Sequence, residues 1–164
     1  SCAEILGPHG GHPKAAGFTI ETDKIAFFKE KLILLVEEKL KNKNFSPTLR
    51  IDLDLDLENL TDDFYKDLVK FEPFGEGNRQ PVFLVKDVEI ADVRIVGKEK
   101  QHLSLKLRSL NGKKIFEGIG FNLGKFYPDL TPDKKIDLAY QLFLDEWNNE
   151  KRLKLKLKDL KIND

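Results

Sequence analysis

The pattern of apolar and polar residues changes near the middle of the chain, at residues 71–83 (FEPFGEGNRQPVF). Before this segment, residues 61–70 repeat apolar side chains at helical spacing, and Thr61 can cap that helix. After Pro81, apolar and polar residues alternate almost to the end, as they do in β-strands. Because Pro73 cannot continue a helix, we predict a rigid elbow between a helical half and an all-β half.

Three elements are predicted before the helix that leads into the elbow. A glycine-rich loop at 7–17 (GPHGGHPKAAG) runs into a strand over 15–20. Asp23 is a candidate N-cap for a helix over 24–41, whose apolar stripe indicates packing. Residues 49–58 alternate strictly, which predicts a strand with its acidic residues on a solvated face.

Five strands are predicted after the elbow. The alternation places them at 87–96, 102–108, 113–121, 135–144 and 152–162. A break in parity at Ala91–Asp92 predicts a bulge that bends the first strand, and residues 122–130 form a short helical or irregular connection. A bulged first strand and an insertion between the third and fourth strands describe an OB-fold barrel.

Composition sets broad limits on the protein. With 164 residues and 40% apolar content, the chain can form one large or two small cores. The 28 basic and 28 acidic residues cancel, so net charge does not indicate a partner. The single cysteine, Cys2, excludes an internal disulfide and predicts a reducing, cytoplasmic compartment. No apolar run approaches the ~18 residues that span a bilayer, so we expect no membrane contact. Methionine is absent and the chain opens inside a motif, so we expect a piece of a longer protein; removal of an initiator before Ser1 would also explain the absence.

The distribution of charge is more informative than the total. Residues 94–116 contain seven basic residues and one acidic residue, and residues 150–158 contain five and one, whereas residues 51–63 contain six acidic residues and no basic one. In an OB-fold the two basic segments lie near the face and loops that hold oligonucleotides. The candidate DNA-binding residues are Arg94, Lys98, Lys100, His102, Lys106, Arg108, Arg152 and Lys154, with Phe116, Phe121, Tyr127 and Trp147 as possible stacking rings.

Simpler explanations exist for the same residues. Lysines on a terminal strand can serve only to block edge pairing, and the Trp147 ring can fold back over the end of the barrel. The aspartates on the predicted strand 49–58 are spread over ~13 Å, too far apart to hold one metal ion.

The glycine-rich loop is a candidate anion site. Gly10 and Gly11 allow close approach of a ligand, and His12 and Lys14 add donors at the same place. From the glycine spacing alone, a tight surface loop with incidental polar residues is the favoured explanation. A metal site from His9 and His12 is disfavoured, because no cysteine or carboxylate cluster accompanies them.

Two motifs together resemble one family. GGHPKAAGFTI at 10–20 resembles the glycine-glycine-histidine motif in the accessory domain of DHH-type phosphoesterases. FEPFGEGNRQPVF at 71–83 resembles the lead-in to the OB-fold of the RecJ single-stranded-DNA exonucleases. Residues 94–97 followed by His102-Leu103 are similar to that family's first barrel hairpin, and the resemblance covers the whole chain.

The resemblance implies a function in DNA repair and recombination. That family degrades single-stranded DNA in the 5′→3′ direction, using Mn²⁺ or Mg²⁺ held in an N-terminal DHH domain. No Asp-His-His triplet occurs here, so we expect no catalytic residue and no metal ligand in this chain. The implied roles are contact of Gly10, Gly11 and His12 with the phosphate near the scissile bond, and binding of single-stranded DNA by the barrel. A single-strand-binding protein or a helicase is a candidate partner.

The predicted fold class is therefore α+β, with a partial α/β accessory domain followed by a five-stranded OB-fold β-barrel. We place the accessory domain at 1–58, the linking helix and elbow at 59–81, and the barrel at 82–164. Two other functions remain open: a stand-alone single-strand-binding module, and a DHH-family phosphodiesterase for very short RNA or cyclic dinucleotides. Residues 82–164 argue against the second, because such enzymes end with the accessory domain. An Asp-His-His motif encoded upstream of Ser1 would separate the exonuclease from the stand-alone module.

Overall fold

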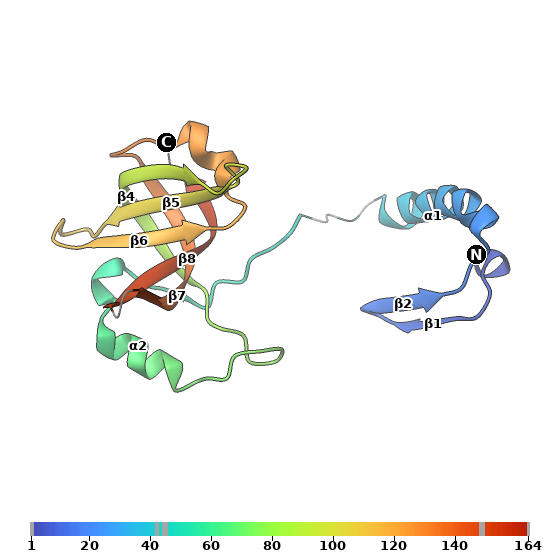
Figure 1. Cartoon of the computed structure of the whole chain (residues 1–164), viewed down its shortest axis with the longest axis horizontal. Coiled ribbons are helices and arrows are strands. Elements are labelled where there is room, and N and C mark those ends of the chain that lie inside the picture. The colour runs from blue at the N-terminus through green and yellow to red at the C-terminus, as the bar shows by residue number, and fades with distance from the viewer. Residues whose placement is uncertain (1, 42, 44–45, 148–149, 164) are drawn as a thin grey trace. The chain divides into compact units, whose positions relative to one another are not determined.

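The chain folds into two compact units, Ser1–Pro47 and Thr48–Asp164, which we describe separately. The computed structural model describes residues 2–41, 43, 46–147 and 150–163. The α+β class and the five-stranded barrel predicted from the sequence are confirmed (Figure 1). No helix in these ranges is long and apolar enough to cross a membrane.

The first unit combines a β-hairpin with one helix. Its elements are η1 (Ala3–Ile5), β1 (His9–His12), β2 (Ala15–Phe18), η2 (Thr22–Lys24) and α1 (Ile25–Leu40). The prediction of a loop over 7–17 was wrong, because His9–His12 pairs antiparallel with Ala15–Phe18. Gly11 allows this close pairing: a Cβ there would lie 2.7 Å from Cα of Ala16.

The helix of the first unit has a different start from the predicted one. Asp23 lies inside the 3₁₀ turn η2, and the N-cap of α1 is Lys24, which makes no side-chain capping bond. Phe28 packs on Phe18, with ring centroids 5.0 Å apart. None of the described side chains of this unit is buried.

The second unit starts with an extended segment that joins the barrel. The predicted strand over 49–58 was wrong in extent: only β3 (Leu53–Asp54) pairs, in parallel with β4, and η3 (Leu57–Asn59) follows. Leu57 and Leu60 are buried in the barrel core. The boundary between the two compact units therefore lies between Pro47 and Thr48. It comes eleven residues before the end of the accessory domain predicted at residue 58.

Helix α2 (Asp62–Val69) leads into the elbow. The amide of Phe64 donates to the Thr61 hydroxyl at 3.1 Å, which confirms Thr61 as the N-cap. Beyond the helix, Asn78 Nδ2 donates to the carbonyl oxygens of Phe71 and Pro73 at 2.8 and 2.9 Å. These two bonds close the elbow loop on itself.

Five described strands close the barrel. They are β4 (Phe83–Val96), β5 (His102–Arg108), β6 (Ile115–Gly120), β7 (Lys135–Trp147) and β8 (Glu150–Ile162), with η4 (Gly124–Asp129) between β6 and β7. Their order is β4-β5-β6-β8-β7, and β7 returns to pair with β4 (Figure 1). This is the connectivity expected for an OB-fold, with β6 and β8 parallel.

Strand β4 belongs to both sides of the barrel. Its first half pairs with β7 from Phe83 to Glu89, and its second half pairs with β5 from Glu89 to Val96. The register shifts between Ile90 and Asp92, which confirms the bulge predicted at Ala91–Asp92. The strand starts at Phe83, four residues before the predicted start at 87. Asp87 has a positive φ of 52°, which interrupts the alternation inside the strand and made its first residues hard to recognise from the sequence.

The core is made by the inward side chains of these strands. Leu103, Leu105 and Leu107 of β5 and Leu138 and Leu142 of β7 are fully buried. The residues that alternate with these inward side chains, such as Ser104 and Lys106 of β5 and Gln141 of β7, are more exposed, so each strand presents a second set of side chains to solvent. Phe116 is buried in the core as well, and its prediction as a stacking ring was wrong.

Candidate nucleic-acid interface

The outer face of β4, β5, β6 and β8 carries a groove. One hollow of about 570 Å³ is lined by Ala91, Asp92, Lys106, Ile115, Glu117, Arg152, Leu153 and Lys154. A neighbouring hollow of about 340 Å³ is lined by Ser104, Glu117, Gly118, Ile119, Phe121, Phe143, Asp145 and Lys154. Because both contain Glu117 and Lys154, they form one depression, which we call the barrel groove. It lies on the OB-fold face that binds oligonucleotides in many proteins of this fold.

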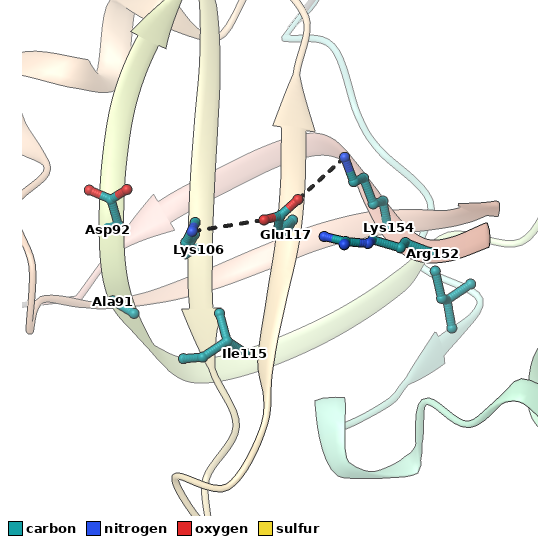
Figure 2. Close-up of a pocket in the computed structure, with 8 residues that line it drawn as sticks. Ala91, Asp92, Lys106, Ile115, Glu117, Arg152 and Lys154 are labelled. Atoms are coloured by element: carbon teal, nitrogen blue, oxygen red, sulfur yellow. Dashed lines mark ion pairs between the residues drawn. The ribbon is translucent and has the colours of Figure 1, made fainter. Parts of the chain in front are cut away.

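An ion-pair chain runs across the barrel groove. Figure 2 shows Glu117 between Lys106 and Lys154, at 3.9 and 3.3 Å. Lys154 also pairs with Asp145 at 2.8 Å, and that hydrogen bond is the main cause of its raised pKa. Lys154 therefore stays charged but is shared by two carboxylates. A phosphate entering the groove must compete with them.

The other predicted cations of these strands are paired in the same way. Arg152 contacts Glu150 at 2.5 Å, Arg94 contacts Asp92 at 2.9 Å, and Arg108 contacts Glu89 at 2.8 Å. All of these pairs have substantial solvent exposure, so each contributes little to stability. Their effect is on the local potential, which is less positive than the count of basic residues indicates.

One aromatic ring is presented openly in the groove. The Phe121 side chain is 53% exposed, and its ring packs on the His102 ring in a T-shaped arrangement with the centroids 5.2 Å apart. His102 Nδ1 accepts a 3.1 Å bond from the amide of Asn122, which orients the imidazole. The Phe121 ring is thus supported on one side and open to a base on the other.

The loop between β4 and β5 supplies cations of a different kind. Lys98 and Lys100 are exposed, and neither has an ion pair among the described contacts. The loop is docked on η4: the amide of Gly124 donates to Gln101 O at 2.9 Å. A Cβ at Gly124 would lie 2.6 Å from the Lys100 carbonyl oxygen, so only glycine permits this approach.

The structure brings some of the predicted residues together and separates others. Lys106, Phe121, Arg152 and Lys154 line the groove, and His102 contacts Phe121. Arg94 of β4 and Arg108 of β5 do not line the groove. Lys98 and Lys100 are in the loop between these two strands. The Trp147 backbone ends β7, but its side chain is outside the described part, so its stacking role stays a prediction.

Sequence reasoning missed the acidic and apolar residues of the groove. These are Asp92, Ile115, Glu117, Phe143 and Asp145. The signal lies in the register: Lys106 is opposite Glu117, and Asp145 is opposite Arg152. Outward charges of opposite sign at facing positions form cross-strand pairs.

The predicted phosphate-binding residues of the first unit lie on its hairpin. Gly10 and Gly11 are in β1, His12 ends it, and Lys14 is in the turn. All four are exposed, and His12 Nδ1 accepts a 3.2 Å bond from the Lys14 amide. The space beside Gly10 is open, since no atom lies within 4 Å of a Cβ placed there. Anion binding at this edge of the hairpin stays a prediction.

The described residues do not offer a metal site. No group of three or more His, Cys, Asp or Glu within 2–41, 43, 46–147 and 150–163 is arranged to hold an ion.

The barrel, its bulged first strand and the groove on its outer face define an OB-fold domain. The chain belongs to the RecJ OB domain family, whose model matches residues 51–159. This confirms the resemblance drawn from the two motifs.

Individual RecJ proteins are similar to this chain over nearly its whole length. It is 29% identical over 163 residues to the single-stranded-DNA-specific exonuclease RecJ of Bacillus subtilis, covering 99% of this chain and 20% of that protein. Two crystal structures of RecJ from Thermus thermophilus, in complex with Mn²⁺ and with Mg²⁺, superpose on all of this chain. Their TM-scores are 0.69 and 0.73, at 25% and 24% identity. The chain spans about a fifth to a quarter of the length of these relatives.

Proposed function

We propose that this chain is the DNA-binding C-terminal region of a RecJ-like exonuclease that degrades single-stranded DNA from the 5′ end in repair and recombination. The observation that carries the proposal is an open groove on the oligonucleotide-binding face of a RecJ OB domain. The similarity to RecJ exonucleases over nearly the full chain supports the same function.

The groove offers two kinds of contact to a single strand. Phe121 provides a ring on which a base can stack, and stacking of this type does not depend on sequence. Lys98 and Lys100 provide unpaired charges for phosphates at the loop end. Lys106, Arg152 and Lys154 would contact phosphates only by exchanging their carboxylate partners. Binding by this chain alone is accordingly weak.

Catalysis in the parent protein is assigned to a DHH domain outside this chain. There Mn²⁺ or Mg²⁺ would activate the attacking water. Within this chain, Gly10, Gly11, His12 and Lys14 would contact the phosphate near the scissile bond, with His12 orienting it. A single-strand-binding protein or a helicase is a candidate partner of the whole enzyme. Incubation of the 164-residue chain with labelled single-stranded DNA and Mn²⁺ should release no mononucleotides; chelator-sensitive release that tracks the purified chain would contradict this assignment.

Binding of a labelled oligo-dT, followed by fluorescence anisotropy at several salt concentrations, tests the proposed function. We expect binding whose log–log salt slope is roughly −2 to −4, as three to five phosphate contacts require at about −0.7 each. Double-stranded DNA of the same length serves as the control and should bind more weakly, since its bases cannot reach Phe121. Absence of binding, or binding insensitive to salt, would refute the proposal.

A further inference from the structure

A second hollow lies at the elbow, away from the barrel groove. It has a volume of about 900 Å³ and is formed by the segment before β3, the elbow loop, and strands β7 and β8. We call it the elbow hollow and define it by Arg50, Asp52, Arg79, Gln80, Gln141 and Lys158. All of these residues belong to the unit Thr48–Asp164, so the site lies within one compact body.

Hydrogen bonds hold the wall of the elbow hollow in place. Gln80 Nε2 donates to the Leu142 carbonyl oxygen at 2.6 Å, and Gln141 Nε2 donates to the Gln80 carbonyl oxygen at 2.9 Å. On the opposite side, Asp52 Oδ2 accepts a 3.0 Å bond from the Val82 amide. These bonds join the elbow loop to β7 and to the segment before β3, so the hollow exists before any ligand binds.

The charges of the elbow hollow differ from those of the barrel groove. In the groove, Lys106, Arg152 and Lys154 all pair with carboxylates. In the hollow, Arg50 pairs with Asp52 at 3.3 Å, but the described contacts give no ion pair to Arg79 or Lys158. Glu76 is the second acidic residue of the lining, against three cations. Counterion release requires cations that are free to meet phosphates, and these are present here.

The register of β7 and β8 connects the hollow to the groove. Phe143 faces Lys154 in the groove, and Gln141, which lines the hollow, faces Lys156. Outward residues of a strand recur every ~6.6 Å, so Lys154 and Lys156 follow one another along β8 at about that spacing, and Lys158 comes next in the same row. Lys158 is the extra residue where the register shifts between Ala139 and Tyr140. Lys156 is exposed and has no ion pair among the described contacts.

We propose that the elbow hollow is a second nucleic-acid subsite, which takes phosphates of the same single strand that occupies the barrel groove. The strand would pass along the lysine row of β8, with Lys156 between the two sites. Arg79 and Lys158 would each meet a phosphate, and the side-chain oxygens of Gln80 and Gln141 would accept hydrogen bonds from base edges. This inference rests on the proposed function, because it extends the path of the same ligand.

Two oligonucleotide lengths and one double variant test this subsite. The probes are labelled oligo-dT of ~4 and ~12 nucleotides, which bracket the site sizes of OB-folds. For the wild-type 164-residue chain the longer probe should bind more tightly and with a steeper salt slope. In Arg79→Ala/Lys158→Ala, the slope for the longer probe should become shallower by about 1.4, which is two phosphate contacts, while binding of the shorter probe is unchanged.

The controls separate a local effect from a general loss of charge or fold. Lys161→Ala removes a cation from the same strand, but one that faces Asp137 and does not line the hollow. It should bind both probes as the wild type does. Lys158→Glu, which reverses a charge of the subsite at an exposed position, should weaken binding of the longer probe only, and circular dichroism checks that each protein is folded.

The outcomes distinguish this inference from the proposed function. If Phe121→Ala weakens binding but the double variant binds the longer probe with wild-type affinity and slope, the elbow subsite is refuted and the groove remains. If the wild-type chain binds neither probe, both the proposed function and the subsite are refuted. Equal losses in the double variant and in Lys161→Ala would also overturn the subsite, because the effect would then be one of overall charge.

Discussion

The Tyr140 hydroxyl donates a 2.8 Å hydrogen bond to the carbonyl oxygen of Leu55. The tyrosine lies on β7 inside the barrel, and Leu55 lies in the extended segment that precedes α2. Burial raises the pKa of the Tyr140 hydroxyl, so it remains a neutral donor. This bond ties the segment before the elbow to the barrel, although the two are 85 residues apart in the chain.

Tyr140→Phe should therefore destabilise the barrel without changing its packing. The substitution keeps the ring and leaves the partly buried Leu55 carbonyl without its partner, which costs about 1 kcal/mol. Urea unfolding followed by circular dichroism measures the loss. Tyr127→Phe is the matched control, since Tyr127 is 38% exposed and should change stability little. Equal stability of the two variants would show that the bond to Leu55 contributes nothing.

Phe121→Ala should weaken binding of single-stranded DNA by about 1–3 kcal/mol, the contribution of one stacked base. Stability should change little, because the ring is more than half exposed. Phe71→Ala is the control, because Phe71 is also exposed, at 66%, but lines neither the barrel groove nor the elbow hollow. Anisotropy titration with oligo-dT gives the affinities. A Phe121→Ala affinity equal to that of the wild type would reject the stacking role.

Glu117→Gln should strengthen DNA binding. The change removes the carboxylate between Lys106 and Lys154 and keeps the side chain's shape. If one further phosphate is then bound, the salt slope should steepen by about 0.7. Asp63→Asn breaks a comparable pair with Lys66 on α2, outside the groove, and should leave affinity and slope unchanged. Weaker binding by Glu117→Gln would indicate that this carboxylate contacts the ligand or positions the lysines.

Asn163→Ala should reduce stability in a pH-dependent way. Asn163 Nδ2 donates to Asp137 and Asp87 at 2.8 and 2.7 Å, and the bond to Asp137 is the main cause of that carboxyl's lowered pKa. A lowered pKa in the folded state stabilises the fold above the ordinary value of about 3.9, and this stabilisation is lost as pH falls through the lower folded value.

Urea unfolding at pH 7, 5 and 3 measures the effect. The difference between wild type and Asn163→Ala should be full at pH 7 and 5 and smaller at pH 3. Asn59→Ala, at an exposed position on the end of η3, is the control and should show no such trend. A difference that is the same at all three pH values would mean that Asn163 acts by packing alone.

The sequence by itself determined the features that depend on local pattern. Strand β5 has the predicted bounds, His102–Arg108, because its inward leucines alternate without interruption. The change of parity at Ala91 is a local signal of the bulge, and Thr61 caps its helix through a bond to a residue three positions on. The two motifs that resemble RecJ proteins are local as well, and the family they indicate was confirmed.

The tertiary structure decided everything that depends on pairing between distant segments. Residues 49–58 alternate like a full strand, yet only Leu53–Asp54 pairs, opposite Phe83–Leu84 at the start of β4. Farther along, from Glu89, β4 pairs with β5 instead. The charge of the groove was also decided by the fold: Lys154 lies beside Glu117 and Asp145 only because β8 runs between β6 and β7. Charges that are separate along the chain compensate one another once the barrel closes, so a count of lysines cannot give the potential of the face they share.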